Sequence, residues 1–169
     1  MLPPARFVIR LVLVAALLPL LFLPASAAST EDHPAVPEIL SRAESLFQRM
    51  KAREYPAIFA VLSAKSRETI VAQTSASLAA AKAAVSDREA VRSDFIKGGP
   101  IAREYWDAFL RNFDPDSVLE HSRWEIGSVG KDRAEILLTH HGADHPAVLK
   151  MFLEEGGWNV GLVETFWPR

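Results

Sequence analysis

The chain has 169 residues, a formal net charge of −2 and no cysteine. The absence of cysteine excludes disulfides, thiolate metal sites and a cysteine nucleophile. Charge of both signs is spread along the chain, and the lack of a basic block or stripe argues against a nucleic-acid-binding surface. The length is that of one domain with its own hydrophobic core.

The first 27 residues have the pattern of a secretory signal peptide. Arg6 and Arg10 precede the uncharged run 11–23, and a small-x-small cleavage site, Ala-Ser-Ala, follows at 25–27. An uncleaved membrane anchor is the alternative, but the run is shorter than the roughly 20 apolar residues that span a bilayer. We expect cleavage after Ala27, localisation in the periplasm or outside the cell, and no membrane association afterwards. Cleavage removes two arginines and no acid, which changes the formal net charge from −2 to −4.

The mature chain is predicted to consist of a polar lead-in, 28–35, and a single domain, 36–169, whose first half is helical. Apolar residues recur at helical spacing from Val36 to Met50, with charges between them. Further helices are predicted at 55–62, in the Ala-rich stretch 66–85, from the capping-box pattern at 86–89 to the glycines at 98–99, and from Pro100 onward. Asp-Pro-Asp at 114–116 is predicted to close the helical half.

After Ser122 the apolar residues alternate with polar ones, which is typical of strands. Four such runs, 122–129, 133–141, 146–155 and 158–166, are separated by short turn sequences. Helices first and a meander of strands last is the pattern of an α+β fold, with N-terminal helices packed on a curved four-stranded antiparallel sheet of order 1-2-3-4.

The loop lengths predict the register of this sheet and therefore its two faces. One predicted row across the strands contains Ile126, Ile136, Met151 and Leu162, and the next contains Trp124, Leu138, Leu149 and Glu164; this face is expected to carry the helices. The reverse face is charged but includes four apolar residues, Leu137, Val148, Phe152 and Val163. They indicate a homodimer contact, although scattered exposed apolar residues are also normal on protein surfaces.

The C-terminal hairpin resembles one found in a known superfamily. Residues 151–163 contain Glu-Gly-Gly-Trp-Asn-Val, similar to the glycine, tryptophan, polar, valine ending of secreted members of the nuclear transport factor two-like, or SnoaL-like, superfamily. The segment 55–62 is similar to the short second helix of those proteins. The resemblance implies a cystatin-like cone, a curved sheet wrapped over helices, often with a pocket at its open end and often dimeric.

Two ionisable residues, His140 and Glu164, are predicted on the helix-facing side of the sheet, near one end. A histidine with a carboxylate is the usual composition of an acid–base site, so both are candidate catalytic residues. The alternative is that both are solvated at the sheet end or take part in structural ion pairs, which are common.

The segment 140–145, His-His-Gly-Ala-Asp-His, raises the question of a metal site. Its consecutive histidines point to opposite faces of a strand, and structural zinc requires a closed ligand set. We therefore interpret the segment as a polar hairpin loop and expect no metal site and no cofactor.

Aromatic and apolar residues of the predicted helix–sheet interface are the candidates for lining a ligand pocket, with core packing as the alternative for each. These candidates are Tyr55, Phe59, Trp106, Phe109, Trp124, Leu138 and Met151.

The sequence therefore predicts a periplasmic or secreted, non-enzymatic domain that binds a small apolar or amphipathic molecule or a protein partner. One alternative is a lyase or isomerase that uses His140 and Glu164. Another is a structural domain that dimerises through the outer face of its sheet. No phosphate loop and no Gly-x-Ser-x-Gly elbow marks a further activity.

Overall fold

The computed structural model describes residues 32–167, so the predicted signal peptide lies outside the described part of the chain. The elements are α1 (Val36–Lys51), α2 (Tyr55–Ala60), α3 (Ala64–Ala80), α4 (Arg88–Lys97), α5 (Pro100–Leu110), α6 (Pro115–His121), β1 (Ser122–Val129), β2 (Arg133–His140), β3 (Ala147–Glu154), β4 (Gly157–Gly161) and α7 (Leu162–Phe166). Between residues 32 and 167 there is no helix with both the length and the apolar character needed to cross a bilayer.

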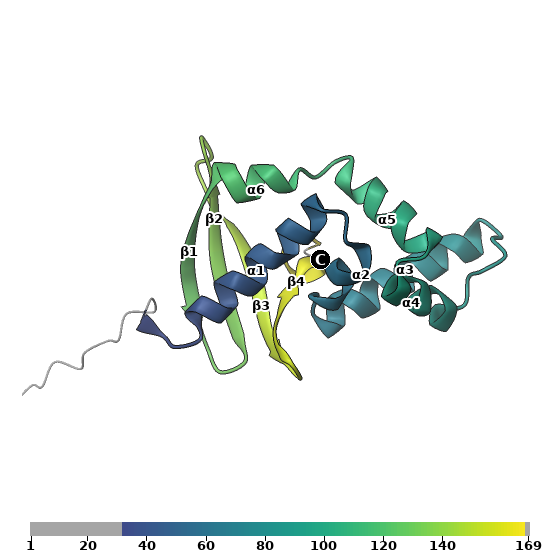
Figure 1. Ribbon diagram of the computed structural model, residues 1–169, viewed down its shortest axis with the longest axis horizontal. Helices are drawn as coiled ribbons and strands as arrows, with labels where there is room; N and C mark the ends of the chain where they lie inside the picture. The colour runs from purple at the N-terminus through teal and green to yellow at the C-terminus, as the bar shows by residue number, and fades with distance from the viewer. Residues whose placement is uncertain (1–31, 168–169) are drawn as a thin grey trace, which may run out of the picture.

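The four strands form one antiparallel sheet of order β1-β2-β3-β4, which confirms the predicted α+β class. Helix α1 crosses one face of this sheet, and α2, α3, α4 and α5 lie together beyond its β4 edge (Figure 1). We call the face covered by α1 the inner face and the opposite one the outer face.

Helix α1 follows the predicted apolar spacing and packs on the inner face. Ile39, Leu46, Phe47 and Met50 have no solvent exposure. Proline at its first turn fits the fixed backbone angle of that position. An acid in the first turn and bases in the last oppose the helix dipole favourably.

A continuous set of aromatic contacts joins the helical half to the sheet. Ring centroids of Phe59 and Phe95 lie 5.1 Å apart, Phe95 contacts Tyr105 at 5.3 Å, and Phe47 meets Trp124 of β1 edge-on at 5.7 Å. Such pairs add to the free energy gained by burying their surface. Burial also raises the pKa of the Tyr105 hydroxyl to about 12.

The predicted register is confirmed between β1 and β2 up to Ile126, which pairs with Ile136. Beyond it a bulge at Gly127 moves the pairing, so Ser128 lies opposite Glu135. For the β2–β3 and β3–β4 pairs, the predicted register differs from the observed one by two residues. Ile136 pairs with Leu149 rather than Met151.

Met151 in turn pairs with Val160 rather than Leu162. The last paired residues of the final hairpin are Glu154 and Gly157, so its turn is centred one residue earlier than predicted. A shift of two residues leaves every side chain on its predicted face because side chains alternate with a period of two. Ile136, Leu149, Met151 and Val160 are accordingly all fully buried.

Two short helices, α6 and α7, form where the sequence predicted other structure. The Asp-Pro-Asp sequence does not end the helical half: the side chain of Asp114 caps α6 by accepting a hydrogen bond from the backbone N–H of Asp116. The fourth predicted strand, 158–166, ends at Gly161, and α7 follows it. Leu162 and Val163 are both buried, which a strand with one solvated face does not permit for consecutive residues.

Gly161 marks the point where β4 ends, and the outer-face side chain of Phe152 packs directly over it. A Cβ atom at this position would overlap the Phe152 ring and lie 3.1 Å from the carbonyl oxygen of Lys150. We expect Gly161→Ala to lower the free energy of unfolding by about 1–3 kcal/mol, the usual cost of overpacking. Gly130→Ala is the matched control, since its added Cβ would have an ordinary contact at 3.4 Å. Equal urea denaturation midpoints for the two variants would contradict the packing described here.

Candidate functional site

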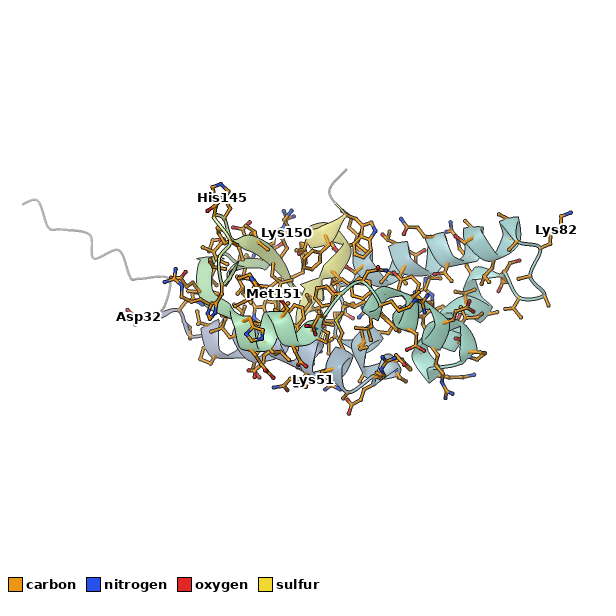
Figure 2. The ribbon with its side chains drawn as sticks, turned by 90° about the horizontal axis from the view of Figure 1, so that it is seen from above. Asp32, Lys51, Lys82, His145, Lys150 and Met151 are labelled. Atoms are coloured by element: carbon orange, nitrogen blue, oxygen red, sulfur yellow. The ribbon has the colours of Figure 1, made fainter. Side chains whose placement is uncertain are left out.

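A groove of about 960 Å³ lies on the outer side of the sheet. Helix α3, helix α7 and the adjoining strands β2 and β3 surround it, and we call it the outer-face groove. In Figure 2 Lys150, which lines it, lies on the opposite side of the molecule from Lys51 at the end of α1. Twelve residues line it: Lys65, Thr69, Gln73, Arg133, Ala134, Glu135, Lys150, Met151, Phe152, Val163, Glu164 and Trp167.

One wall of the groove is a stripe of polar side chains on α3. Lys65, Thr69 and Gln73 are spaced four residues apart, and that spacing brings side chains to the same face of a helix. The helix begins where Ser63 provides the cap, its Oγ accepting a hydrogen bond from the N–H of Ser66 at 3.0 Å. This wall therefore offers one ammonium group and two neutral polar groups.

The opposite wall is formed by outward-pointing residues of β2 and β3. Arg133 lies directly opposite Phe152, and Glu135 lies directly opposite Lys150. The carboxylate of Glu135 accepts a hydrogen bond from the hydroxyl of Ser128 at 3.1 Å. Cation, ring and carboxylate therefore occupy neighbouring positions on one surface.

Helix α7 contributes the apolar part of the groove. Val163 is nearly buried, whereas Trp167, just after the helix, leaves 39% of its surface exposed. Two hydrogen bonds fix this helix: the N–H of Lys150 donates to Thr165 Oγ1, and the N–H of Val163 donates to Ser66 Oγ, each at 3.0 Å. Beyond the helix, the ring of Trp167 stacks on that of Phe109 in α5, with the ring centroids 6.2 Å apart.

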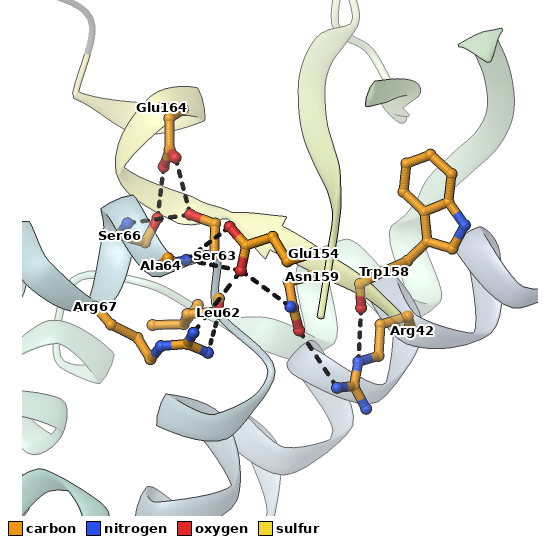
Figure 3. A network of polar contacts seen from close by, with 10 residues as sticks. All are labelled: Arg42, Leu62, Ser63, Ala64, Ser66, Arg67, Glu154, Trp158, Asn159 and Glu164. Carbon is orange, nitrogen blue, oxygen red and sulfur yellow. Dashed lines mark hydrogen bonds and ion pairs between the residues drawn. The ribbon is translucent and has the colours of Figure 1, made fainter. Parts of the chain in front are cut away.

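Below the groove, Glu164 is bound by two serines at the start of α3 (Figure 3). The hydroxyl of Ser63 donates to its Oε1 at 2.8 Å, and that of Ser66 donates to its Oε2 at 2.6 Å. A carboxylate at a helix N-terminus is also favoured by the helix dipole. Both oxygens thus have partners, and the arrangement joins α7 to α3.

A second carboxylate, Glu154, joins the final hairpin to the same helix end. Its two oxygens accept the N–H of Ala64 at 2.9 and 3.0 Å, and Oε2 also accepts from the side-chain amide of Asn159 at 3.2 Å. Arg67 lies 3.7 Å from it. The side-chain oxygen Oδ1 of Asn159 accepts a hydrogen bond from the guanidinium of Arg42 in α1 at 3.3 Å (Figure 3). The network thus links α1, β4 and α3.

The charges of the groove are unequally paired. Glu135 and Glu164 are hydrogen-bonded to serine hydroxyls. Within residues 32–167, by contrast, the side chains of Lys65, Arg133 and Lys150 form no hydrogen bond and no ion pair. Three exposed cations beside an apolar floor make a surface that can receive an anionic or amphipathic molecule.

The two catalytic candidates are not brought to one sheet face, so their predicted placement was wrong. Glu164 lies in α7. His140 is exposed at the end of β2, with its Nδ1 2.8 Å from the carbonyl oxygen of His141 and its ring 6.5 Å from that of His121. The alternation of residues 158–166 had suggested a strand, but contacts with α3 hold its second half as a helix. Among the described residues no group of three histidines or acids is arranged to hold a metal ion.

The predicted pocket residues occupy several places. Met151, Trp106 and Leu138 are all buried in the core, and Met151 also borders the outer-face groove. The hydroxyl of Tyr55 donates to Asp107 at 2.7 Å. The other three are distributed as follows: Phe59 borders a recess of about 350 Å³ and Trp124 one of about 270 Å³, while Phe109 packs against the ring of Trp106.

The four residues predicted as a dimer contact do not share one sheet face. Val163 lies in α7 with 8% exposure, and Phe152 lines the groove. Leu137 covers Gly127, where an added Cβ would lie 3.3 Å from it. Val148 is 36% exposed. The shift from strand to helix after Gly161 removes Val163 from the predicted set.

Comparison with known proteins gives no match: neither a family model, nor a curated protein, nor a solved structure is similar to this chain.

The buried side of the groove is a sensitive point for folding because Ser66 both donates and accepts there. Its hydroxyl has no solvent exposure and serves Glu164 and the N–H of Val163. We expect Ser66→Ala to lower the free energy of unfolding by about 1–3 kcal/mol, the cost of leaving buried polar groups unpaired. Ser77→Ala, at an exposed position of the same helix, should change it by less than about 0.5 kcal/mol. Chemical denaturation measures both, and equal effects would show that the serine does not anchor α7.

Proposed function

We propose that this protein is a non-enzymatic binding domain that holds a small amphipathic molecule in the outer-face groove. The observation that carries the proposal is the composition of that groove: apolar groups, Phe152, Val163 and Trp167, adjoin polar and cationic ones from α3 and β2–β3. Its volume of about 960 Å³ lies within the range of roughly 300–1,000 Å³ that is usual for small-molecule sites.

The proposal includes export. The signal-peptide pattern of residues 1–27 supports a periplasmic or secreted location, where a carrier would meet amphipathic metabolites and lipids. The resemblance to the nuclear transport factor two-like superfamily supports a binding role in general terms. It implies a pocket between sheet and helices at the open end of a cone, whereas the groove proposed here lies on the other face of the sheet.

The contacts of Glu164 and His140 favour a binding role over acid–base chemistry. Glu164 is held by Ser63 and Ser66 at the start of α3, whereas His140 lies at the end of β2 beside His121, the last residue of α6. A catalytic pair must be within hydrogen-bond reach of one substrate. No shared position for such a substrate follows from these contacts.

Binding can be measured through Trp167, whose exposed ring lines the groove. Trp106 and Trp158 are buried, and the half-buried Trp124 borders a different recess. We expect decanoate, used below its aggregation concentration, to change tryptophan emission saturably. Gln73→Phe should weaken this binding at least about tenfold, because the larger ring enters the groove from α3. Ala79→Phe places the same ring at an exposed position of α3 that does not line the groove, and it should bind like the unaltered protein. Equal binding by both variants would place the site elsewhere.

A further inference from the structure

The three unpaired cations of the outer-face groove specify the class of molecule that it receives. Given the binding role proposed above, on which this inference rests, we infer that the ligand is a single-chain amphiphile with an anionic head group. The head group lies between Arg133, Lys150 and Lys65, and the chain extends over Phe152, Val163 and Trp167. The register of the strands, the cation on α3 and the hydrogen bonds of the acids support this assignment.

The register of β2 and β3 places two of the cations near each other. Arg133 pairs with Phe152 and Glu135 pairs with Lys150, so Arg133 and Lys150 are diagonal neighbours on the same face. Diagonal neighbours lie about 7–8 Å apart at their backbones. Two long cationic side chains at that separation can both reach one carboxylate, sulfate or phosphate group between them. A guanidinium also offers a planar pair of donors to such a group.

Helix α3, on the other wall of the groove, contributes a third cation. Lys65 begins the groove-lining stripe of α3, followed at intervals of four by Thr69 and Gln73. Its ammonium group comes from a different element than Arg133 and Lys150, so an anion in the groove is approached from both walls. The neutral polar residues further along the stripe neither attract nor repel a head group by charge.

The acids of the groove already accept hydrogen bonds from serine hydroxyls. Two carboxylates, Glu135 and Glu164, also line the groove, and they would repel an anion. Glu164 has both oxygens occupied by serine hydroxyls, and Glu135 accepts from Ser128. The cations, by contrast, have no such partners within residues 32–167. Both acids keep their negative charge, but three cations against two carboxylates leave the groove with a formal charge of +1, whereas the 169-residue chain has a formal net charge of −2.

The apolar side fixes the position of the chain. Phe152 stands directly opposite Arg133, and the other apolar lining residues are Val163 on α7 and Trp167 just after it. A hydrocarbon chain leaving the head group thus meets a ring at once and can bury its surface along α7, which is favourable in proportion to the apolar area removed from water.

The test compares three probes of equal chain length by isothermal titration calorimetry: decanoate, decan-1-ol and decyltrimethylammonium, each below its aggregation concentration. We expect decanoate to bind at least about tenfold more tightly than decan-1-ol and the cationic probe to bind most weakly. Raising the ionic strength should weaken decanoate binding because salt screens exposed charges. Decan-1-ol binding should be insensitive to salt.

Arg133→Gln and Lys150→Gln identify the responsible groups. Combined, they should weaken decanoate binding about tenfold or more and leave decan-1-ol binding unchanged. Lys131→Gln is the matched control, since this exposed cation in the β1–β2 turn does not line the groove. Circular dichroism confirms that all variants are folded.

The outcomes separate the inference from the function on which it rests. Equal affinity for all three probes, or loss of both decanoate and decan-1-ol binding in the double variant, overturns the anionic head group and leaves the binding role intact. No binding of any probe to the unaltered protein overturns the binding role itself.

Discussion

The structure depends on how the start of α3 is attached to the end of the chain. Residues 61–63 run beside β4 as a single parallel bridge, in which the N–H of Ser63 donates to Val160 at 2.8 Å and the N–H of Val160 donates to Val61 at 2.9 Å. Glu154 and Glu164 then occupy the N–H and hydroxyl groups at the helix start. Buried hydrogen bonds of this kind are costly to leave unmade, so α3, β4 and α7 hold one another in place and together create the groove.

The alternation of apolar residues was sufficient to predict the order and the faces of the sheet, because both depend on a period of two. It was insufficient for the pairing of individual residues. The first hairpin was predicted correctly as far as Ile126, but Leu138 of β2 pairs with Ala147 of β3, two residues from its predicted partner Leu149. The polar loop between these strands, 141–146, can take up or release two residues without exposing an apolar side chain, so periodicity alone does not fix the register.

The candidate site was harder to predict because a tertiary contact determines it. In isolation, residues 158–166 alternate as a strand does, and the helix that replaces their second half is fixed by Ser66 of α3, almost a hundred positions away along the chain. Local propensity is often overridden by such contacts. Once α7 is placed, Lys65, Arg133, Lys150 and Trp167 surround one groove, although no spacing in the sequence connects them.

Leaving the cations of the groove without acidic partners costs the fold little free energy. Elsewhere many exposed cations have acidic neighbours; Lys51, for example, lies 2.6 Å from Asp116 and 3.1 Å from Glu120. Exposed pairs of this kind contribute only about 0–1 kcal/mol each, so leaving Lys65, Arg133 and Lys150 without partners sacrifices little folding free energy. The same three charges, placed against an apolar surface rather than in open solvent, interact more strongly with an incoming anion because the adjacent low-dielectric surface screens them less. Unpaired cations are thus nearly neutral for the fold and favourable for a ligand of opposite charge.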